Sequence, residues 1–292
     1  MPPVRRVSRD VRDDLKKALK MKKSDKSTPK PKRLPLVERT NALSLEEFIS
    51  TYIPSSGLRF QKPNKKPNGS ISTERPQDND CQADANVETA AQGSQSLLTT
   101  KEETTLVSYA LSIYTASTIP DIELDSCFKL IEETSSTAYT NSSMGWSPRE
   151  KKREMKLPDM KYMILRQLDP KPDVVSDENQ NVDSDGGRFA GFISFMVTYE
   201  DGYEVLYCYE IHLTPEVQGQ GLGDVLMARF EDIGRRVGLE KTMLTCFKSN
   251  TRAIRFYTRI GYAEDENSPR PRKLRNGTVK EADYLIMSKK LR

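Results

Sequence analysis

The glycine-rich hexapeptide from Gln218 to Gly223 has residue types and a spacing that suit anion binding. It lies between an apolar run at residues 205–213 and a stretch at 221–237 whose apolar side chains recur at helical spacing. A glycine turn at the start of a helix exposes unpaired backbone N–H groups, and the helix dipole adds partial positive charge. Gly221 has no Cβ that would hold a phosphate away from the backbone. The sequence therefore predicts a phosphate-binding turn here.

Two well-known phosphate motifs do not fit this turn. The nucleotide-binding P-loop ends in Gly-Lys-Ser/Thr, whereas Gly223 is followed by Asp224 and Val225. The dinucleotide fingerprint needs a third glycine where Asp224 stands. A looser pattern, Gln/Arg-x-x-Gly-x-Gly/Ala, fits without adjustment from Gln218 onwards. A tight turn without any ligand is the remaining alternative.

Glu210 places a carboxyl group within the apolar run that precedes this turn. Burial on an apolar strand is expected to raise the pKa of its carboxyl towards the range of a general base. His212, the single histidine of the chain, shares the face of Glu210 by period-two alternation. Tyr207 and Tyr209 would then face the opposite side, unless a β-bulge near Glu210 brings all three into one groove. Both arrangements remain open at this stage.

The elements that position these residues follow from periodicity. Strands are expected near residues 104–115, 162–165, 189–198, 205–213, 241–247 and 284–288, and helices near 122–139, 221–237 and 250–260. Strands that come first and then alternate with helices favour an α/β protein with a mixed sheet.

Composition divides the chain into four parts. Residues 1–40 are expected to form a disordered basic tail, since residues 1–60 carry a net charge of +8. Residues 41–57 contain a short helix, capped by Ser44 with Glu47 three residues later, that is expected to dock on the later domain. Residues 58–103 are expected to form a disordered polar insert, and residues 104–292 a folded domain. The tail is suited to contacts with a ribosome, RNA or an import receptor, or serves only for solubility.

Cysteine and histidine usage limits the chemistry. Four cysteines without a CxxC pair and a single histidine exclude a zinc site of the usual spacing, so no metal is expected. Reduced thiols suit a protein of the nucleus and cytoplasm. No run of 18 or more apolar residues is present, so no membrane partner is expected.

A second motif extends the argument beyond the glycine turn. The segment Asn250-x-x-Ala253-x-x-Phe256-Tyr257, which ends at Gly261 and Tyr262, follows the turn at a distance of about thirty residues. Together the two segments resemble the GNAT superfamily of acetyltransferases. The resemblance implies a GNAT-type acyl-CoA N-acyltransferase fold with acetyl-CoA as cosubstrate. It also implies that Asn250 binds the pantetheine arm and that Tyr257 lies near the sulfur, where it could protonate the leaving thiolate.

A narrower resemblance, to the histone N-terminal acetyltransferases of the N-alpha-acetyltransferase D type, rests on three further segments. These are residues 206–211, residues 243–248 and the Met144-Gly145-Trp146 tripeptide. The resemblance covers roughly residues 41–57 and 104–292, and implies transfer of acetyl to the N-terminal amine of tails that begin Ser-Gly-Arg-Gly. The alternatives are a GNAT enzyme for lysine side chains or small amines, and a non-catalytic acyl-CoA-binding module tethered to ribosomes or chromatin.

Matched residue by residue, the resemblance makes Glu210, rather than His212, the general base. The implied acetyl-CoA contacts are Ile211, His212, Leu213, Gln218, Gly219, Gln220, Gly221, Leu222, Gly223, Asp224, Thr245 and Asn250. The implied substrate contacts are Tyr139, Trp146, Thr198, Tyr199, Glu200, Tyr207 and Tyr209.

This chain also departs from the pattern: Met144 stands in place of a tryptophan and Thr198 in place of an acidic residue. A cluster of Glu200, Asp201, Glu204 and Glu210 nevertheless suits a cationic peptide.

Overall fold

A computed structural model of the chain describes residues 34–63, 106–168 and 187–292. The expected disorder of residues 1–33 and of most of the 58–103 insert therefore lies outside the described residues. The described strands form an eight-stranded sheet in the order β1-β2-β3-β4-β5-β6-β10-β7. Their bounds are β1 (Arg59–Pro63), β2 (Leu106–Thr115), β3 (Lys161–Leu168), β4 (Gly187–Glu200), β5 (Tyr203–Leu213), β6 (Lys241–Phe247), β7 (Ala263–Glu264) and β10 (Tyr284–Lys290).

All neighbouring strands of this sheet run antiparallel except β5 and β6, which run parallel. A separate hairpin joins β8 (Arg272–Lys273) to β9 (Val279–Lys280). The parallel pair is connected through a helix, because parallel neighbours need a crossover. These features confirm the predicted α/β class with a mixed sheet.

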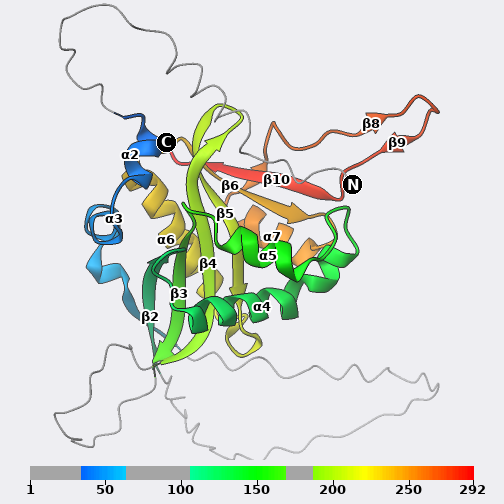
Figure 1. Cartoon of the computed structure of the whole chain (residues 1–292). Helices are drawn as coiled ribbons and strands as arrows, with labels where there is room; N and C mark the ends of the chain where they lie inside the picture. The colour runs from blue at the N-terminus through cyan, green and yellow to red at the C-terminus, as the bar shows by residue number, and fades with distance from the viewer. Residues whose placement is uncertain (1–33, 64–105, 169–186) are drawn as a thin grey trace, which may run out of the picture.

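Helices cover both faces of the sheet (Figure 1). One face carries α2 (Leu36–Asn41), α3 (Leu45–Tyr52), α6 (Leu222–Val237) and α7 (Thr251–Arg259), and the other carries α4 (Asp121–Thr140) and α5 (Pro148–Met155). Two short 3-10 turns, η1 (Ser55–Gly57) and η2 (Pro215–Val217), complete the described elements. Because both faces are covered, the central strands are apolar over most of their length.

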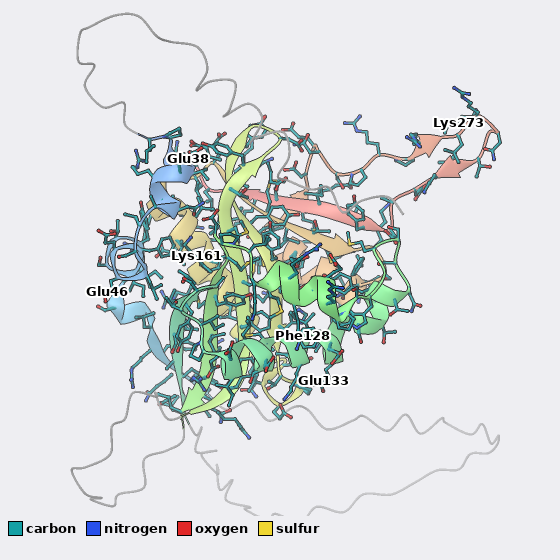
Figure 2. The ribbon with its side chains drawn as sticks, viewed as in Figure 1. Glu38, Glu46, Phe128, Glu133, Lys161 and Lys273 are labelled. Atoms are coloured by element: carbon teal, nitrogen blue, oxygen red, sulfur yellow. The ribbon has the colours of Figure 1, made fainter. Side chains whose placement is uncertain are left out.

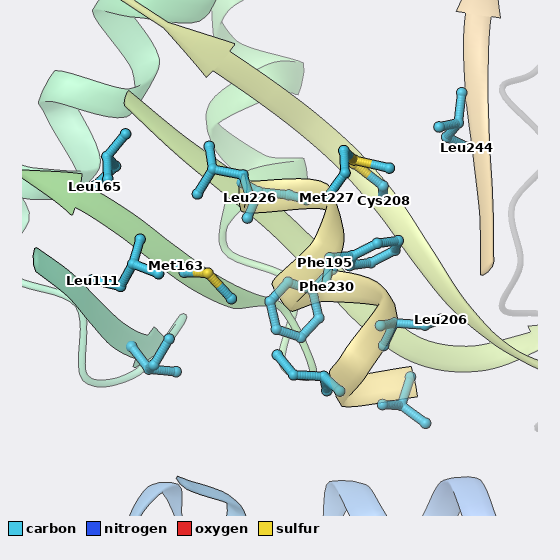
Figure 3. Close-up of a cluster of buried hydrophobic side chains, with 14 of the residues drawn as sticks. Leu111, Met163, Leu165, Phe195, Leu206, Cys208, Leu226, Met227, Phe230 and Leu244 are labelled. Atoms are coloured by element: carbon cyan, nitrogen blue, oxygen red, sulfur yellow. The ribbon is translucent and has the colours of Figure 1, made fainter. Parts of the chain in front are cut away.

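Two hydrophobic clusters hold these layers together. The larger lies between the sheet and α6, where the rings of Phe195 and Phe230 pack edge to face with centroids 5.7 Å apart (Figure 3). Leu206 and Leu226 are fully buried beside them. The smaller cluster lies under α4 and α5 and includes Phe128, which Figure 2 shows on α4. The sheet is therefore a rigid support for residues on either face.

The N-terminal segment differs in part from the expectation. The helix within residues 41–57 is present as α3, with the predicted capping box between Ser44 and Glu47. However, α2 lies within the range expected to be tail, and β1 lies within the range expected to be insert. β1 pairs with β2 along its length, and Phe60 stacks on Tyr109 at 5.4 Å. Its sequence contains one large apolar residue, so periodicity alone did not indicate a strand.

Of the two arrangements that the sequence left open for β5, the structure shows the one with a β-bulge. Glu210 pairs with Ser194 of β4, but Phe195 pairs with Cys208, so Tyr209 is an extra residue in the ladder. The bulge interrupts the alternation, and the side chains of Tyr209 and Glu210 consequently lie on the same face, towards α4. Two consecutive residues of β5, Tyr209 and Glu210, therefore lie on the same face of the sheet.

The described residues also show the state of three cysteines, and they contain neither a helix that could span a membrane nor a metal-ligand cluster. Cys127, Cys208 and Cys246 are buried free thiols, as the sequence predicted, whereas Cys81 lies outside the described ranges. No helix in the described part of the chain combines the length and apolar character required to cross a bilayer. Within the same residues, no group of three or more His, Cys, Asp and Glu side chains is arranged to hold a metal ion.

Candidate active site

Glu210 lies at the centre of a buried polar network. Its carboxylate, 8% exposed, accepts hydrogen bonds from Lys151 of α5 at 2.8 Å and from the Tyr139 hydroxyl of α4 at 3.0 Å. Nε2 of His212 lies 2.7 Å from the other carboxylate oxygen. His212 is held in turn by Thr134, whose hydroxyl oxygen lies 2.7 Å from Nδ1. The position of the carboxylate is therefore fixed from both sides.

The charge state of Glu210 differs from the expectation. Burial does act to raise the pKa of its carboxyl, but the Lys151 ammonium and the hydrogen bond from His212 outweigh that effect and lower the pKa to about 2. The prediction of a raised pKa was therefore wrong, because the sequence did not show that a lysine from another helix would pair with this residue. Glu210 is a stable carboxylate at neutral pH.

Tyr207 and Tyr209 share the face of Glu210, with ring centroids 5.4 Å apart. The hydroxyl of Tyr207 lies 2.5 Å from that of Thr245 on β6. Burial raises the pKa of both tyrosines, and the negative charge of Glu200 adds to this effect. Thr198 alternates with Tyr199 on β4 and therefore points to this same face.

An aromatic wall adjoins the carboxylate. The Tyr139 ring packs against Trp146 at 5.7 Å and edge-on against Phe247 at 5.1 Å. Trp146 also stacks on Phe128 of α4 at 6.2 Å. The ammonium group of Lys151 lies 4.6 Å from the centre of the Tyr139 ring. The structure thus brings together Tyr139, Trp146 and Glu210, which are far apart in the sequence.

Tyr199, which was assigned to the substrate side, and Glu204, a member of the acidic cluster, lie on the opposite face of the sheet. The Tyr199 side chain packs against the α6 face of the sheet, and its hydroxyl donates to Glu38 of α2 at 3.0 Å. Glu204 pairs with Tyr199 in the ladder, and its charge helps to raise the pKa of that tyrosine, so it belongs to the same face. The assignment of Tyr199 to the substrate site was wrong, because strand alternation places it opposite Thr198. The acidic cluster proposed from the sequence is accordingly divided between two faces.

The glycine turn has the conformation that its sequence predicted. Gly219 and Gly221 have φ angles of 76° and 74°, in the left-handed region that glycine tolerates. The side chains of Gln218 and Gln220 are used within the turn, where they donate to the carbonyl oxygens of Leu213 and Glu216 at 3.0 and 2.9 Å. Among the described residues, the N–H groups at positions 219–222 have no hydrogen-bond acceptor. N–H groups without an acceptor at the first turn of a helix are suited to bind an anion.

The start of α6 is fixed by contacts with α7. Leu222 is fully buried, so its backbone rather than its side chain is available to a ligand. Gly223 lies so close to Phe256 that a Cβ would approach the ring to 3.3 Å. Asp224 forms an ion pair with Arg259 at 2.8 Å. The arginine compensates the negative charge of this carboxylate, which would otherwise repel an anion bound at the turn. Asp224 therefore supports the site rather than offering its own charge to a phosphate.

The second motif forms the start of α7. Asn250 is the N-cap residue, and its side-chain oxygen accepts a hydrogen bond from the N–H of Ala253 at 3.0 Å, which leaves the amide NH2 available. Tyr257 is 8% exposed, and burial raises the pKa of its hydroxyl well above 10.0. The negative charge of Glu210 adds to that effect, while the Tyr257 side chain itself packs in the cluster on the α6 face of the sheet.

The hydrogen-bond ladder between β5 and β6 is short. It runs from Val205↔Lys241 to Cys208↔Leu244, which leaves residues 209–213 of β5 without a strand partner on that side. Ile211 and Leu213 direct their side chains to the α6 cluster, so it is their backbone that remains available. This free strand edge leads from Glu210 to the glycine turn. The residues therefore fit an extended ligand with a phosphate-bearing end, which is the chemistry of coenzyme A.

Residues 144–262, which include Trp146, Glu210, the glycine turn and Tyr257, match the sequence model of the acetyltransferase (GNAT) family. The mixed sheet and its short parallel pair form the GNAT acetyltransferase fold. Acetyl transfer is the reaction class that this fold and family match support.

A curated relative is N-alpha-acetyltransferase 40 of Saccharomyces cerevisiae, which is 28% identical over 170 residues. That match spans 52% of this chain and about half, 55%, of the relative.

Similar solved structures include the ribosomal-protein-S18-alanine N-acetyltransferase from Escherichia coli, with 19% identity and a TM-score of 0.37 over 62% of this chain and 94% of that one. Another is spermidine N-acetyltransferase from Vibrio cholerae in complex with CoA and spermine, with 14% identity and a TM-score of 0.41 over 62% and 95% of the two chains.

Sequence reasoning missed several residues that the structure places at the site. Lys151 stands in a run of charged residues that resembles an exposed helix end, and no local signal distinguishes it from its neighbours. Thr134 and Phe247 likewise reach the site only through tertiary packing. Lys62 lies in the range expected to be insert, yet it contacts the glycine turn. Pairing in the sheet, rather than composition, brings it there.

Proposed function

We propose that this chain transfers an acetyl group from acetyl-CoA to the N-terminal α-amine of protein substrates of the histone-tail type, which begin Ser-Gly-Arg-Gly. The single observation that carries the proposal is the buried Glu210 network, placed on the bulged strand that leads to the glycine turn. The similarity to an N-alpha-acetyltransferase supports the choice of an α-amine.

Acetyl-CoA would be held along the free edge of β5 and at the glycine turn. The N–H groups at positions 219–222 would bind its pyrophosphate, and the amide NH2 of Asn250 would bind its pantetheine arm. When bound, this cosubstrate supplies the acetyl group as an activated thioester. Backbone N–H groups near Ile211 and Leu213 are suited to polarise the thioester carbonyl, since no strand covers this edge.

Glu210 would position the incoming amine rather than deprotonate the ammonium form outright. A terminal amine has a reference pKa of about 7.7–8.0, so roughly a quarter of it is neutral at pH 7.4. A carboxylate with a pKa of about 2 is a weak base, but it can accept a proton once the nitrogen bonds to carbon and becomes strongly acidic. The fixed charge of Lys151 beside it favours the neutral amine over the ammonium form.

Tyr257 would donate the proton that the departing thiolate requires. Its raised pKa keeps the hydroxyl protonated at neutral pH, and it lies on α7, the helix that Asn250 caps. The proton balance is then as follows: the neutral amine loses one proton to Glu210 as the nitrogen–carbon bond forms, the carbon–sulfur bond breaks, and the thiolate takes the proton of Tyr257 and leaves as the thiol. Transfer of a proton from Glu210 back to Tyr257 through solvent restores both groups.

The substrate class follows from charge and shape. Glu154, paired with Lys151 at 2.7 Å, and Glu200 add negative charge around Glu210, which suits a cationic peptide. The aromatic side chains of Tyr139, Trp146 and Tyr209 are suited to a peptide substrate whose first residue is small. A GNAT enzyme for lysine side chains or small amines is the alternative within the same chemistry.

Mass spectrometry of a Ser-Gly-Arg-Gly-Lys peptide, incubated with the protein and acetyl-CoA, tests this substrate assignment. We expect one acetyl group on the α-nitrogen and none on a matched peptide whose N-terminus is already blocked. Acetyl found on the lysine side chain of both peptides would contradict the α-amine assignment and support the alternative.

Glu210→Gln tests the role of the carboxylate and separates an enzyme from a module that only binds acyl-CoA. We expect turnover to fall at least about tenfold, because a positioned acid–base group contributes this much or more. Acetyl-CoA binding, measured by calorimetry, should persist, because the glycine turn is unchanged. Unchanged turnover would remove Glu210 from the mechanism.

A further inference from the structure

Lys62 reaches the glycine turn from the edge of the sheet. It lies on β1, which β2, β3 and β4 separate from β5, and it precedes the family match at 144–262. Its ammonium group donates to the carbonyl oxygen of Gln220 at 3.2 Å and to that of Gly221 at 2.8 Å. A Cβ on Gly221 would lie only 2.7 Å from this nitrogen. The absence of a side chain at Gly221 is therefore what admits the lysine.

These two hydrogen bonds determine the direction in which the backbone N–H groups of the turn point. In a trans peptide, the C=O of one residue and the N–H of the next point in opposite directions. Because Lys62 holds the carbonyl oxygens of Gln220 and Gly221, the N–H groups of Gly221 and Leu222 face away from it. Those N–H groups have no acceptor among the described residues, and they lie at the start of α6.

The surroundings of Lys62 strengthen this arrangement. The hydroxyl of Tyr109, on the neighbouring β2, donates to the side-chain oxygen of Gln220 at 3.2 Å, so β1 and β2 both hold the same residue of the turn. No carboxylate of the described residues lies within ion-pair distance of Lys62. Its positive charge is thus available to stabilise an anion bound at the turn.

We infer that Lys62 is a positioning residue for cofactor binding: it fixes the glycine turn with its N–H groups directed at the pyrophosphate of coenzyme A. The inference rests on the proposed use of acetyl-CoA. It makes the N-terminal segment, through β1, part of the cofactor site. Lys62 acts through the turn and not on the reacting atoms, so its loss should affect cofactor affinity and not the chemical step.

The test is calorimetric titration of the full chain with coenzyme A, comparing Lys62→Met with the wild type. We expect the Kd to rise about tenfold, because charge-assisted hydrogen bonds that orient the turn are lost. At saturating acetyl-CoA, kcat should stay within about twofold of the wild type. S-acetylpantetheine, a thioester without the pyrophosphate, should be used with unchanged kcat/KM. Lys62→Arg should recover most of the coenzyme A affinity.

A matched control separates this role from simple docking of β1. Gln61→Ala removes the hydrogen bond between Gln61 and Ser108 of β2 but leaves the turn untouched, so it should bind coenzyme A like the wild type. Equal losses in Gln61→Ala and Lys62→Met would overturn the inference, as would an equal loss with S-acetylpantetheine or no loss at all. A wild-type chain that fails to bind coenzyme A would instead overturn the proposed function.

Discussion

Glu210 shows how strongly tertiary partners control a single carboxyl group. Its position on an apolar strand favours the neutral form, but Lys151 and His212 hold it ionised. Removing either partner of such a buried pair leaves an uncompensated charge, so the three side chains act as one unit. The catalytic role proposed for Glu210 therefore depends on α5, which contributes the lysine.

The pH dependence of stability provides a direct test of this pairing. The pKa of Glu210 is lowered in the folded state, from an ordinary value of 4.5 to about 2. Its contribution to stability is therefore fully present above pH 4.5 and is lost as the pH falls through 4.5 towards 2. We expect the difference in unfolding free energy between wild type and Glu210→Gln to be constant from about pH 7 to 5 and to shrink below about 4.5.

Urea denaturation at a series of pH values measures this difference. Glu133→Gln, which removes an exposed carboxylate from α4, is the matched control and should show no comparable change. A difference for Glu210→Gln that grew as the pH fell below 4.5 would mean that the carboxylate is not paired as described.

The glycine turn and the first turn of α6 form a unit that depends on backbone conformation. Gly221 is the N-cap residue of α6 and needs a positive φ, and Gly223 allows α7 to pack closely. Side chains from β1, β2 and α7 surround the unit, so its shape is set before any ligand arrives. Such preorganisation reduces the entropic cost of binding.

Gly221→Ala tests this unit. A left-handed φ costs a residue with a Cβ about 1–2 kcal/mol, and the new methyl group would also displace Lys62, whose nitrogen lies 2.7 Å away. We expect a loss of about 1–2 kcal/mol in unfolding free energy and a weaker affinity for coenzyme A, measured by urea denaturation and calorimetry.

Gly277→Ala is the control for this substitution, because Gly277 has a φ of 85° but no atoms within 4 Å of a Cβ. It should carry the same backbone strain without any change in coenzyme A affinity. If both variants bind coenzyme A normally, the turn does not depend on Gly221.

The N-terminal segment and the central sheet with α6 share one hydrophobic core. Phe48 of α3 is 1% exposed and belongs to the same cluster as Phe195 and Phe230, on the α6 face of the sheet. The Tyr199 hydroxyl holds α2 through Glu38, and β1 extends the sheet. The described parts of the chain should consequently unfold as one unit.

Phe48→Ala measures this coupling. Removal of a buried phenylalanine ring costs about 3–5 kcal/mol, so we expect a large drop in Tm with a single transition seen by both circular dichroism and tryptophan fluorescence. Trp146 lies in the other cluster, under α4, and reports on the opposite face. The exposed Glu46 on the same helix offers the control Glu46→Ala, which should change little. Two separate transitions would show that the segment folds independently.

The sequence by itself determined the features that lie within a short window of residues. The left-handed glycines of the turn, the capping box at Ser44, the N-cap at Asn250 and the strand that carries Glu210 all follow from local propensity and periodicity. The bulge at Tyr209 was only one of two arrangements that the sequence left open, because local alternation does not show whether Tyr209 and Glu210 share a face.

Only the tertiary structure decided which distant groups meet. Lys151 contacts a carboxylate 59 residues away, and Lys62 contacts a turn more than 150 residues away. The face on which Tyr199 lies depends on the register of β4 with β5. Periodicity specifies which residues share a face but not what packs against it. The ionisation of Glu210 and the orientation of the glycine turn were therefore fixed by long-range packing, which no local pattern encodes.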